Sequence, residues 1–202
     1  MRGGIPGQGP HQLVSGQKSP SRTRMALVAL SEQLCDKRCF VEVVAIYLMG
    51  EAPQRPVAVE KDLFGRSAFN RFYYAAYLTV RAALLAGLGE CPKSHSDVPD
   101  FLLGKVSRGL TQGEQRARRV SDTELAKLCS RARTSARELA EILKEGYSVR
   151  VTADYFPEVP VIFEANGEFG LNTVHISKAR SWPPKADAMC KSICIAWRQA
   201  NA

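Results

Sequence analysis

Two separate segments of this chain carry the side chains that proteins use to hold phosphates and nucleobases. The first segment places an amide, two phenols and a guanidinium at positions i, i+4, i+7 and i+11, so these groups share one face of a helix. They are Asn70, Tyr74, Tyr77 and Arg81. The second segment, RVTADY at 150–155, adds another guanidinium, a carboxylate and a phenol. Because guanidinium groups bind phosphate and tyrosine rings stack on bases, the two segments indicate a nucleotide site.

We therefore take one set of polar and aromatic residues as candidates for nucleotide or RNA binding. They are Asn70, Arg71, Tyr74, Arg81, His95, Arg150, Asp154 and Tyr155. Each member also has a structural interpretation: tyrosines on a mixed helix face pack in many cores, and Arg150 with Asp154 forms an ordinary ion pair. His95 alone would be a capping or packing histidine. The functional interpretation thus applies to the whole set and not to any single residue.

The net charge of +8 is concentrated in two parts of the chain. Residues 1–24 carry four basic residues and no acidic one, and residues 105–150 carry eleven Lys or Arg against six Asp or Glu. In the second part we expect a helix with a basic outer face. This candidate basic patch consists of Lys127, Arg131, Arg133 and Arg137. Such a face suits a polyanion such as RNA, although a solvated helix face has the same composition.

The cysteines give little support to a metal site. Cys35 with Cys39 and Cys190 with Cys194 are spaced i, i+4, but the tight Cys-x-x-Cys pair typical of zinc sites is missing. Helical cysteines are commonly small buried hydrophobes, so we predict neither a metal nor another cofactor. The chain also lacks a run of about 18 uncharged apolar residues and a signal-peptide core, which favours a cytoplasmic protein without a membrane partner.

Helices must position these candidates, and the spacing of apolar residues places four to five of them. The expected ranges are 25–49, 67 to about 89 with Val59 as an alternative start, 95–104, 121–145 and 183–199. Glycines at 104, 109 and 113 predict a loop after the third helix. Ser121 with Glu124 predicts a capping box, and Gly146 predicts the end of the fourth helix. In the last helix, which begins at Pro183-Pro184, Ile193 and Trp197 are expected in the core.

A different pattern follows residue 146. The β-branched run YSVRVTADY at 147–155 and the run PVIFEANGEFGLNTVHI predict two or three antiparallel strands. Asn166-Gly167 predicts a type I′ turn with positive φ at both residues. The expected fold is an all-α up-and-down bundle of four to five helices over 25–202, with a β-hairpin inserted at about 148–176. Residues 1–24 are expected to be a disordered tail, with Met25 as a candidate natural start.

The second helix resembles a known family. Residues 67–95 match the second helix of HEPN domains through a small first residue, Arg-x-Tyr-Tyr-Ala-Ala, Arg-Ala and Pro-Lys-x-His. RVTADY is similar to the Arg-x-x-Ala-Asp-Tyr signature of the same family. HEPN domains are small helical bundles, and many act on RNA or nucleotides. The resemblance implies a homodimer that binds RNA, a nucleotide or a partner such as a nucleotidyltransferase, in a toxin–antitoxin or defence system.

The resemblance favours binding over cleavage. HEPN ribonucleases carry an Arg followed after four to six residues by a His, and no histidine of this chain follows an Arg at that spacing. The residue five positions after Arg150 is Tyr155, and a phenol with an ordinary pKa near 10 is a poor base at neutral pH. A binding module is therefore the first expectation. The alternatives are a divergent metal-independent endoribonuclease that uses Arg150, Tyr155 or His95, and a structural dimeric scaffold.

Overall fold

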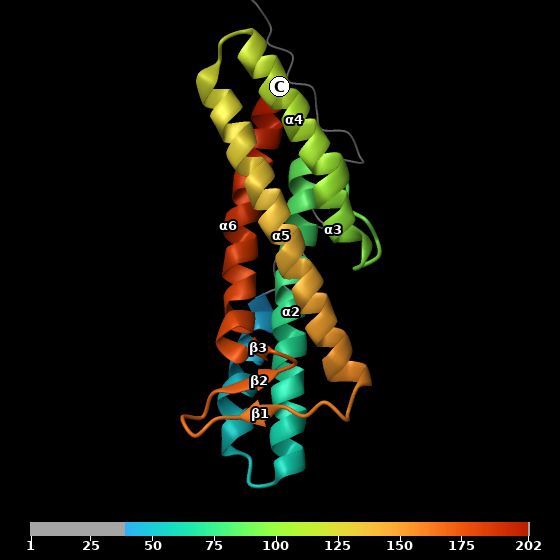
Figure 1. Ribbon diagram of the computed structural model, residues 1–202, viewed down its shortest axis with the longest axis vertical. Helices are drawn as coiled ribbons and strands as arrows, with labels where there is room; N and C mark the ends of the chain where they lie inside the picture. Colours follow the sequence, from blue (N-terminus) through green and yellow to red (C-terminus); the bar gives the residue numbers. More distant parts are fainter. Residues whose placement is uncertain (1–38, 202) are drawn as a thin grey trace, which may run out of the picture.

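The computed structural model describes residues 39–201 as a bundle of long helices with a small sheet near one end (Figure 1). The helices are residues 39–51, α2 (Ala58–Leu88), α3 (Asp97–Phe101), α4 (Ser107–Arg119), α5 (Thr123–Tyr155) and α6 (Ile176–Ala200). A 3₁₀ segment, η1 (Ala52–Gln54), follows the first helix, and a π segment, η2 (Leu102–Val106), joins α3 to α4. The predicted helical bundle with an inserted β-element is confirmed. Residues 1–38, which include the predicted tail, lie outside the described residues.

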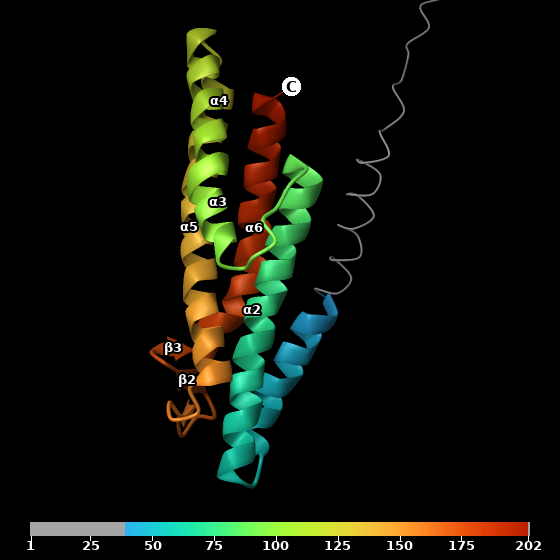
Figure 2. The ribbon, with the colours of Figure 1, turned by 90° about the vertical axis from the view of Figure 1, so that its right-hand side faces the viewer.

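Helices α2, α5 and α6 form the centre of the bundle, and α4 and the helix of residues 39–51 pack on its sides (Figure 2). The chain runs in the same direction in α2 and α6 and in the opposite direction in α5. Large aromatic side chains fill the space between them. Phe69, Phe72, Tyr73 and Tyr77 of α2 and Trp182 of α6 are each at most 2 % exposed. Because burying one such side chain stabilises a fold by about 1.5–3 kcal/mol, these contacts fix how the helices pack.

The prediction of a loop around Gly104, Gly109 and Gly113 is wrong, because α3, η2 and α4 together form one continuous helical segment over residues 97–119. A Cβ atom on Gly109 would lie 2.4 Å from Cζ3 of Trp197, and one on Gly113 would lie 2.6 Å from Cβ of Ala200. Both partners belong to α6. The glycines therefore let two helices approach each other closely, and this packing outweighs the weak helical propensity of glycine.

Helix α5 extends to Tyr155, so the strand predicted at 147–155 is wrong. Val149, Thr152 and Ala153 are buried and continue the helical stripe, which shows that burial overrides their propensity for strands. Gly146 does not end the helix either, because it lies where a Cβ would come within 2.9 Å of Cδ2 of Tyr73. The predicted Ser121 capping box is wrong, because the N-cap is Asp122, whose side chain accepts a hydrogen bond from the Leu125 N–H at 3.0 Å.

Helix α6 begins at Ile176, seven residues before the predicted start, and contains Pro183 and Pro184 in its interior. Ile176, Ala179 and Trp182 are buried in the first turns, and this anchoring offsets the two hydrogen bonds that proline removes. Of the predicted core pair, Ile193 is fully buried, whereas Trp197 is half-buried and packs against the core. Trp182 is the tryptophan that fills the centre.

The sheet contains three short antiparallel strands in the order β1 (Ile162–Phe163), β2 (Phe169–Leu171) and β3 (Val174–His175). The type I′ turn predicted at Asn166-Gly167 is wrong, because only Gly167 has a positive φ, of 82°. The Gly167 N–H donates to the Glu164 carbonyl at 3.0 Å, which is the pattern of a longer loop with one left-handed glycine. Positive φ at two adjacent residues occurs instead in the next turn, at Asn172 and Thr173.

A buried arginine joins α2, α5 and the sheet. Arg66 is 7 % exposed, and its Nη1 donates to the carbonyls of Thr152, Ala153 and Phe156 at 3.3, 3.3 and 3.1 Å. Its Nη2 donates to the Pro157 and Val159 carbonyls, and its Nε pairs with Asp62. The other oxygen of Asp62 accepts the Val161 N–H at 2.8 Å. Arg66 therefore caps the C-terminus of α5 and holds the segment that leads into β1.

Gly146 and Gly104 give a matched test of the close packing between the α5 backbone and the Tyr73 ring. Gly146→Ala is expected to destabilise the protein by about 1–2 kcal/mol, because the cost of overpacking against Tyr73 exceeds the gain in helix propensity. Gly104→Ala is expected to be neutral or to stabilise by up to about 1 kcal/mol, since the nearest atom to its Cβ is Nη2 of Arg108 at 3.8 Å. Urea denaturation of both variants measures the difference. Equal midpoints would contradict the close approach at Gly146.

Candidate functional site

The candidate site lies where α2 meets α5 and the segment before α3. This segment places the His95 imidazole flat against the Tyr77 ring, with 3.7 Å between ring centroids and 17° between planes. Tyr74 meets the same imidazole edge-on at 5.4 Å. The Tyr73 hydroxyl lies 3.0 Å from Nδ1 of His95, within hydrogen-bond distance. Three successive contacts from α2 thus fix the position and orientation of one histidine.

The last turns of α5 supply the charged part of the site. Nη2 of Arg150 lies 2.9 Å from Oδ2 of Asp154, and its guanidinium carbon lies 5.5 Å from the Tyr155 ring centroid. Asn70 of α2 donates a hydrogen bond from Nδ2 to the other oxygen of Asp154. Asp154 therefore connects α2 to α5 and holds Arg150 in place. The Arg150 side chain is 20 % exposed, so solvent reaches it.

The electrostatics of the site keep its aromatic acids and bases neutral. Burial lowers the pKa of His95, and the positive charges of Arg150 and Arg81 lower it further. Burial, with the neighbouring tyrosines Tyr77, Tyr74 and Tyr147, raises the pKa of Tyr73. Burial acts to lower the pKa of Arg150, but Asp154, Tyr74 and Tyr155 raise it overall. The His95 imidazole and the Tyr73 phenol are thus uncharged at neutral pH, and the Arg150 guanidinium beside them is charged.

The structure brings together all the predicted site residues except one. Asn70, Tyr74, Arg81 and His95 come from or beside α2, and Arg150, Asp154 and Tyr155 meet them from α5. Arg71 is exposed on α2 and takes no part in the contacts described above. The role of the other seven residues in binding stays a prediction, whereas their proximity to one another is observed.

Three residues of the cluster, Tyr73, Tyr77 and Tyr147, were not in the candidate set, although Tyr77 belongs to the polar helix face from which that set was taken. Tyr73 stands at an apolar position of α2, and its ring is buried, but its hydroxyl lies next to His95. Tyr147 lies 6.1 Å from Tyr73 between ring centroids, and it was assigned to a strand. A signal for Tyr147 was present in the sequence, because Tyr147, Arg150 and Asp154 are spaced i, i+3 and i+7, which places them on one helix face.

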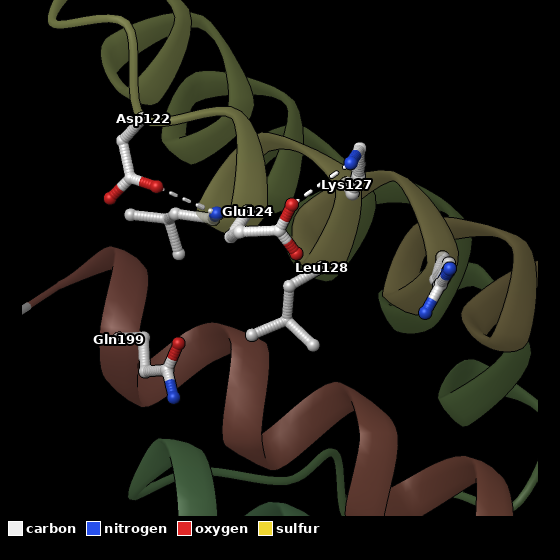
Figure 3. A pocket seen from close by; sticks show the side chains of 7 residues that line it. Asp122, Glu124, Lys127, Leu128 and Gln199 are labelled. Carbon is white, nitrogen blue, oxygen red and sulfur yellow. Dashed lines mark hydrogen bonds and ion pairs between the residues drawn. The ribbon is translucent and has the colours of Figure 1, made fainter.

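The predicted basic patch does not form one continuous face. At about 100° per residue, Arg133 lies about 120° around α5 from Lys127, and Arg137 lies at a similar angle from Arg131. Arg133 faces α4, where Nη1 lies 3.2 Å from both Glu114 and Thr111. Lys127 pairs with Glu124 at 2.9 Å, beside a hollow that Gln199 of α6 also lines (Figure 3). Arg131 and Arg137 are exposed. Two of the four basic side chains are therefore in ion pairs, and the other two, Arg131 and Arg137, point in directions about 120° apart around α5.

Two further observations concern the predicted class of protein. Cys190 and Cys194 are buried, as expected for small hydrophobic residues, and burial raises the pKa of both thiols. Cys39 is exposed, contrary to that expectation, and Cys35 lies outside the described residues. None of the described helices combines the length and the apolar character that crossing a bilayer requires.

The comparisons with known proteins found no relative. No family model, no curated protein and no solved structure matches this chain. The resemblance to HEPN domains therefore stays a prediction based on two motifs, and the function has to be argued from the geometry of the site.

The low pKa of His95 predicts a specific dependence of stability on pH. Because folding favours the neutral imidazole, His95 contributes stability that is fully present above its unfolded pKa of about 6.5 and is lost as the pH falls through the lower folded value. Unfolding free energies at pH 7.5 and pH 5.0 should therefore differ more for the wild type than for His95→Gln. His175 is present in both proteins, so its contribution to the pH dependence cancels in the comparison. An identical pH dependence would show that His95 is accessible and unperturbed.

Proposed function

We propose that this chain is a binding module for RNA or a nucleotide, with the phosphate held at Arg150 and Arg81. The observation that carries the proposal is the fixed guanidinium of Arg150, which Asp154 orients and which solvent reaches. A guanidinium presents five N–H donors in a plane, and carboxylate binding uses only part of them. Nε of Arg81 and Nε of Arg150 are buried and have no hydrogen-bond partner among the described residues. The protein leaves the positive charge of these groups without an acceptor there, which favours an anion at the solvent-exposed part of each guanidinium.

Aromatic rings beside the cations supply the second half of a nucleotide site. Tyr155 is 65 % exposed and lies next to Arg150, and Phe156 follows it with 45 % exposed. Rings of this kind offer a face on which a base stacks, which contributes about 1–3 kcal/mol per base. A nucleotide with its phosphate at Arg150 and its base on Tyr155 would use both the positive charge and the exposed aromatic ring of this surface.

The resemblance to HEPN domains supports the same proposal. Its two motifs lie in different helices, and Asn70, which directly precedes Arg71 of the first motif, donates a hydrogen bond to Asp154 of the second. A meeting of this kind is expected if both motifs serve one site. The apolar contacts of α2 with α5 would not by themselves require an amide, a carboxylate and a guanidinium there.

A second candidate function is RNA cleavage without a metal, and the lowered pKa of His95 favours it. A neutral imidazole is the form that accepts a proton, and Arg150, which lowers the pKa of His95, is a fixed cation of the kind that stabilises a reacting phosphate. Against it, Nδ1 of His95 is engaged by Tyr73 and one ring face is covered by Tyr77, so only Nε2 is left for chemistry.

Fluorescence anisotropy with a labelled single-stranded RNA tests the binding proposal. Arg150→Ala should weaken binding by roughly tenfold or more, because it removes one charge-assisted contact worth about 1.5–3 kcal/mol. It should also lower the slope of log Kd against log salt by about one phosphate contact. Arg180→Ala, which removes an exposed arginine from α6, is the matched control and should change the affinity by less than about twofold. Equal effects of the two variants would contradict the site.

The same RNA, incubated with EDTA and separated on a denaturing gel, distinguishes the two functions. The binding module leaves the RNA intact. Cleavage by the wild type that is lost in both His95→Gln and Arg150→Ala would establish the second candidate instead.

A further inference from the structure

A histidine outside the proposed nucleotide site joins the small sheet to the last helix. His175 ends β3 and directly precedes α6, so the strand and the helix fix its backbone (Figure 1). Its Nδ1 lies 2.8 Å from the hydroxyl oxygen of Ser177, in the first turn of α6. Its Nε2 lies 3.3 Å from Oε1 of Glu164, which follows β1. One imidazole thus lies between a hydroxyl and a carboxylate, with one ring nitrogen facing each.

A second carboxylate beside the ring leaves Ser177 as the hydrogen-bond partner of Nδ1. Oε2 of Glu168 lies 3.6 Å from this nitrogen, which is too long for a hydrogen bond. Among the described residues, the Ser177 hydroxyl has no other hydrogen-bond partner than His175. A hydroxyl on one nitrogen of an imidazole and a carboxylate near the other is the arrangement that activates a serine as a nucleophile, and it is recognised by geometry and not by position in the chain.

The hydroxyl and the imidazole are both open to a substrate. Ser177 is exposed, and the His175 side chain is 38 % exposed. His175 and Glu164 also line a hollow of about 260 Å³, whose apolar part is formed by Ile162, Gly170 and Val174. Sites for drug-sized ligands have volumes of about 300–1,000 Å³, so this hollow suits a smaller group.

We propose that Ser177 and His175, with Glu164 behind them, form an esterase site for small uncharged esters. The Ser177 Oγ attacks the carbonyl carbon of the ester while its proton moves to Nδ1 of His175. The tetrahedral intermediate then expels the alcohol, which takes this proton from Nδ1, and an acyl group stays on Ser177. Water attacks the acyl carbon after giving a proton to Nδ1, and this proton returns to Oγ as the carboxylic acid leaves.

Glu164 is a positioning residue in this mechanism. Its carboxylate lies beside Nε2, so it favours the form of the ring that carries its proton there and leaves Nδ1 free to accept the proton of the serine. The same negative charge stabilises the imidazolium that forms when Nδ1 is protonated. The first turn of α6, in which no side chain caps the backbone, lies beside the developing negative charge on the ester oxygen.

This activity goes beyond the binding of RNA or a nucleotide. Its three residues lie in β3, in the first turn of α6 and after β1, and none of them belongs to the site of Arg150 and Arg81. Either proposal can therefore fail without the other.

A fluorophosphonate probe, followed by mass spectrometry of the full chain, tests the nucleophile. Such a probe is attacked at phosphorus by an activated serine and loses fluoride, so the wild type should carry the label on Ser177. His175→Gln should slow the labelling by at least about a hundredfold, because it removes the base. Ser181→Ala, which removes another exposed hydroxyl of α6, is the matched control and should be labelled at the rate of the wild type.

Circular dichroism checks that the labelled variants keep their helical content. Ser177→Ala, at an exposed helical position, should abolish the label and stays informative if His175→Gln fails to fold. An unlabelled wild type, a label on another residue, or equal labelling rates in the wild type and a folded His175→Gln would overturn the proposal.

The hydrolysis of para-nitrophenyl acetate tests the positioning role of Glu164. Glu164→Gln should lower kcat by at least about tenfold and leave KM unchanged, because the carboxylate acts on the imidazole and not on the substrate. Glu158→Gln, at an exposed position after α5, is the matched control and should keep the kcat of the wild type within about twofold. An equal kcat in the wild type and Glu164→Gln would overturn this role.

Discussion

The arrangement of the whole bundle depends on how the C-terminus of α5 is held. The last carbonyls of a helix have no partner within the helix, and a cation is favoured there because the helix dipole is negative at that end. Arg66 of α2 meets both requirements at once, since its guanidinium contacts two carbonyls of the final turn and three of the segment that follows. Arg150, Asp154 and Tyr155 lie in the turns that Arg66 holds. The position of the candidate site is therefore a consequence of one buried side chain on another helix.

A second constraint is the close approach of the helices at glycine. At Gly146 the backbone of α5 touches the Tyr73 ring, and the hydroxyl of that ring reaches His95. At Gly109 and Gly113 the backbone of α4 touches α6 in the same manner. Protein interiors are packed as densely as organic crystals, so a shift of one helix is transmitted to its neighbours. The histidine environment thus depends on glycines that never contact it.

The sequence predicted the parts of this structure that rest on local periodicity. The long second helix, the helical bundle and the polar face of Asn70, Tyr74 and Arg81 follow from apolar spacing and from the 3.6-residue repeat. The interpretation of glycine and of β-branched residues was wrong, because their effect was decided by distant partners such as Trp197 for Gly109. Arg66 carried no local signal, since its carbonyl partners lie 86 to 93 residues away in the chain. Its contacts appear only once α2 and α5 have been packed together.

The pairing of Asp154 with Arg150 has a consequence for selectivity. Any anion that arrives at Arg150 competes with a carboxylate that is already seated there and is held by Asn70. Chloride and simple carboxylates bring no more charge and no more acceptor oxygens than Asp154, so they gain little by replacing it or by sharing the guanidinium. A phosphate ester carries more acceptor oxygens, and a terminal phosphate also carries more negative charge at neutral pH. If Arg150 binds an anion as proposed, the carboxylate of Asp154 would therefore compete with it and would favour phosphate over chloride and simple carboxylates.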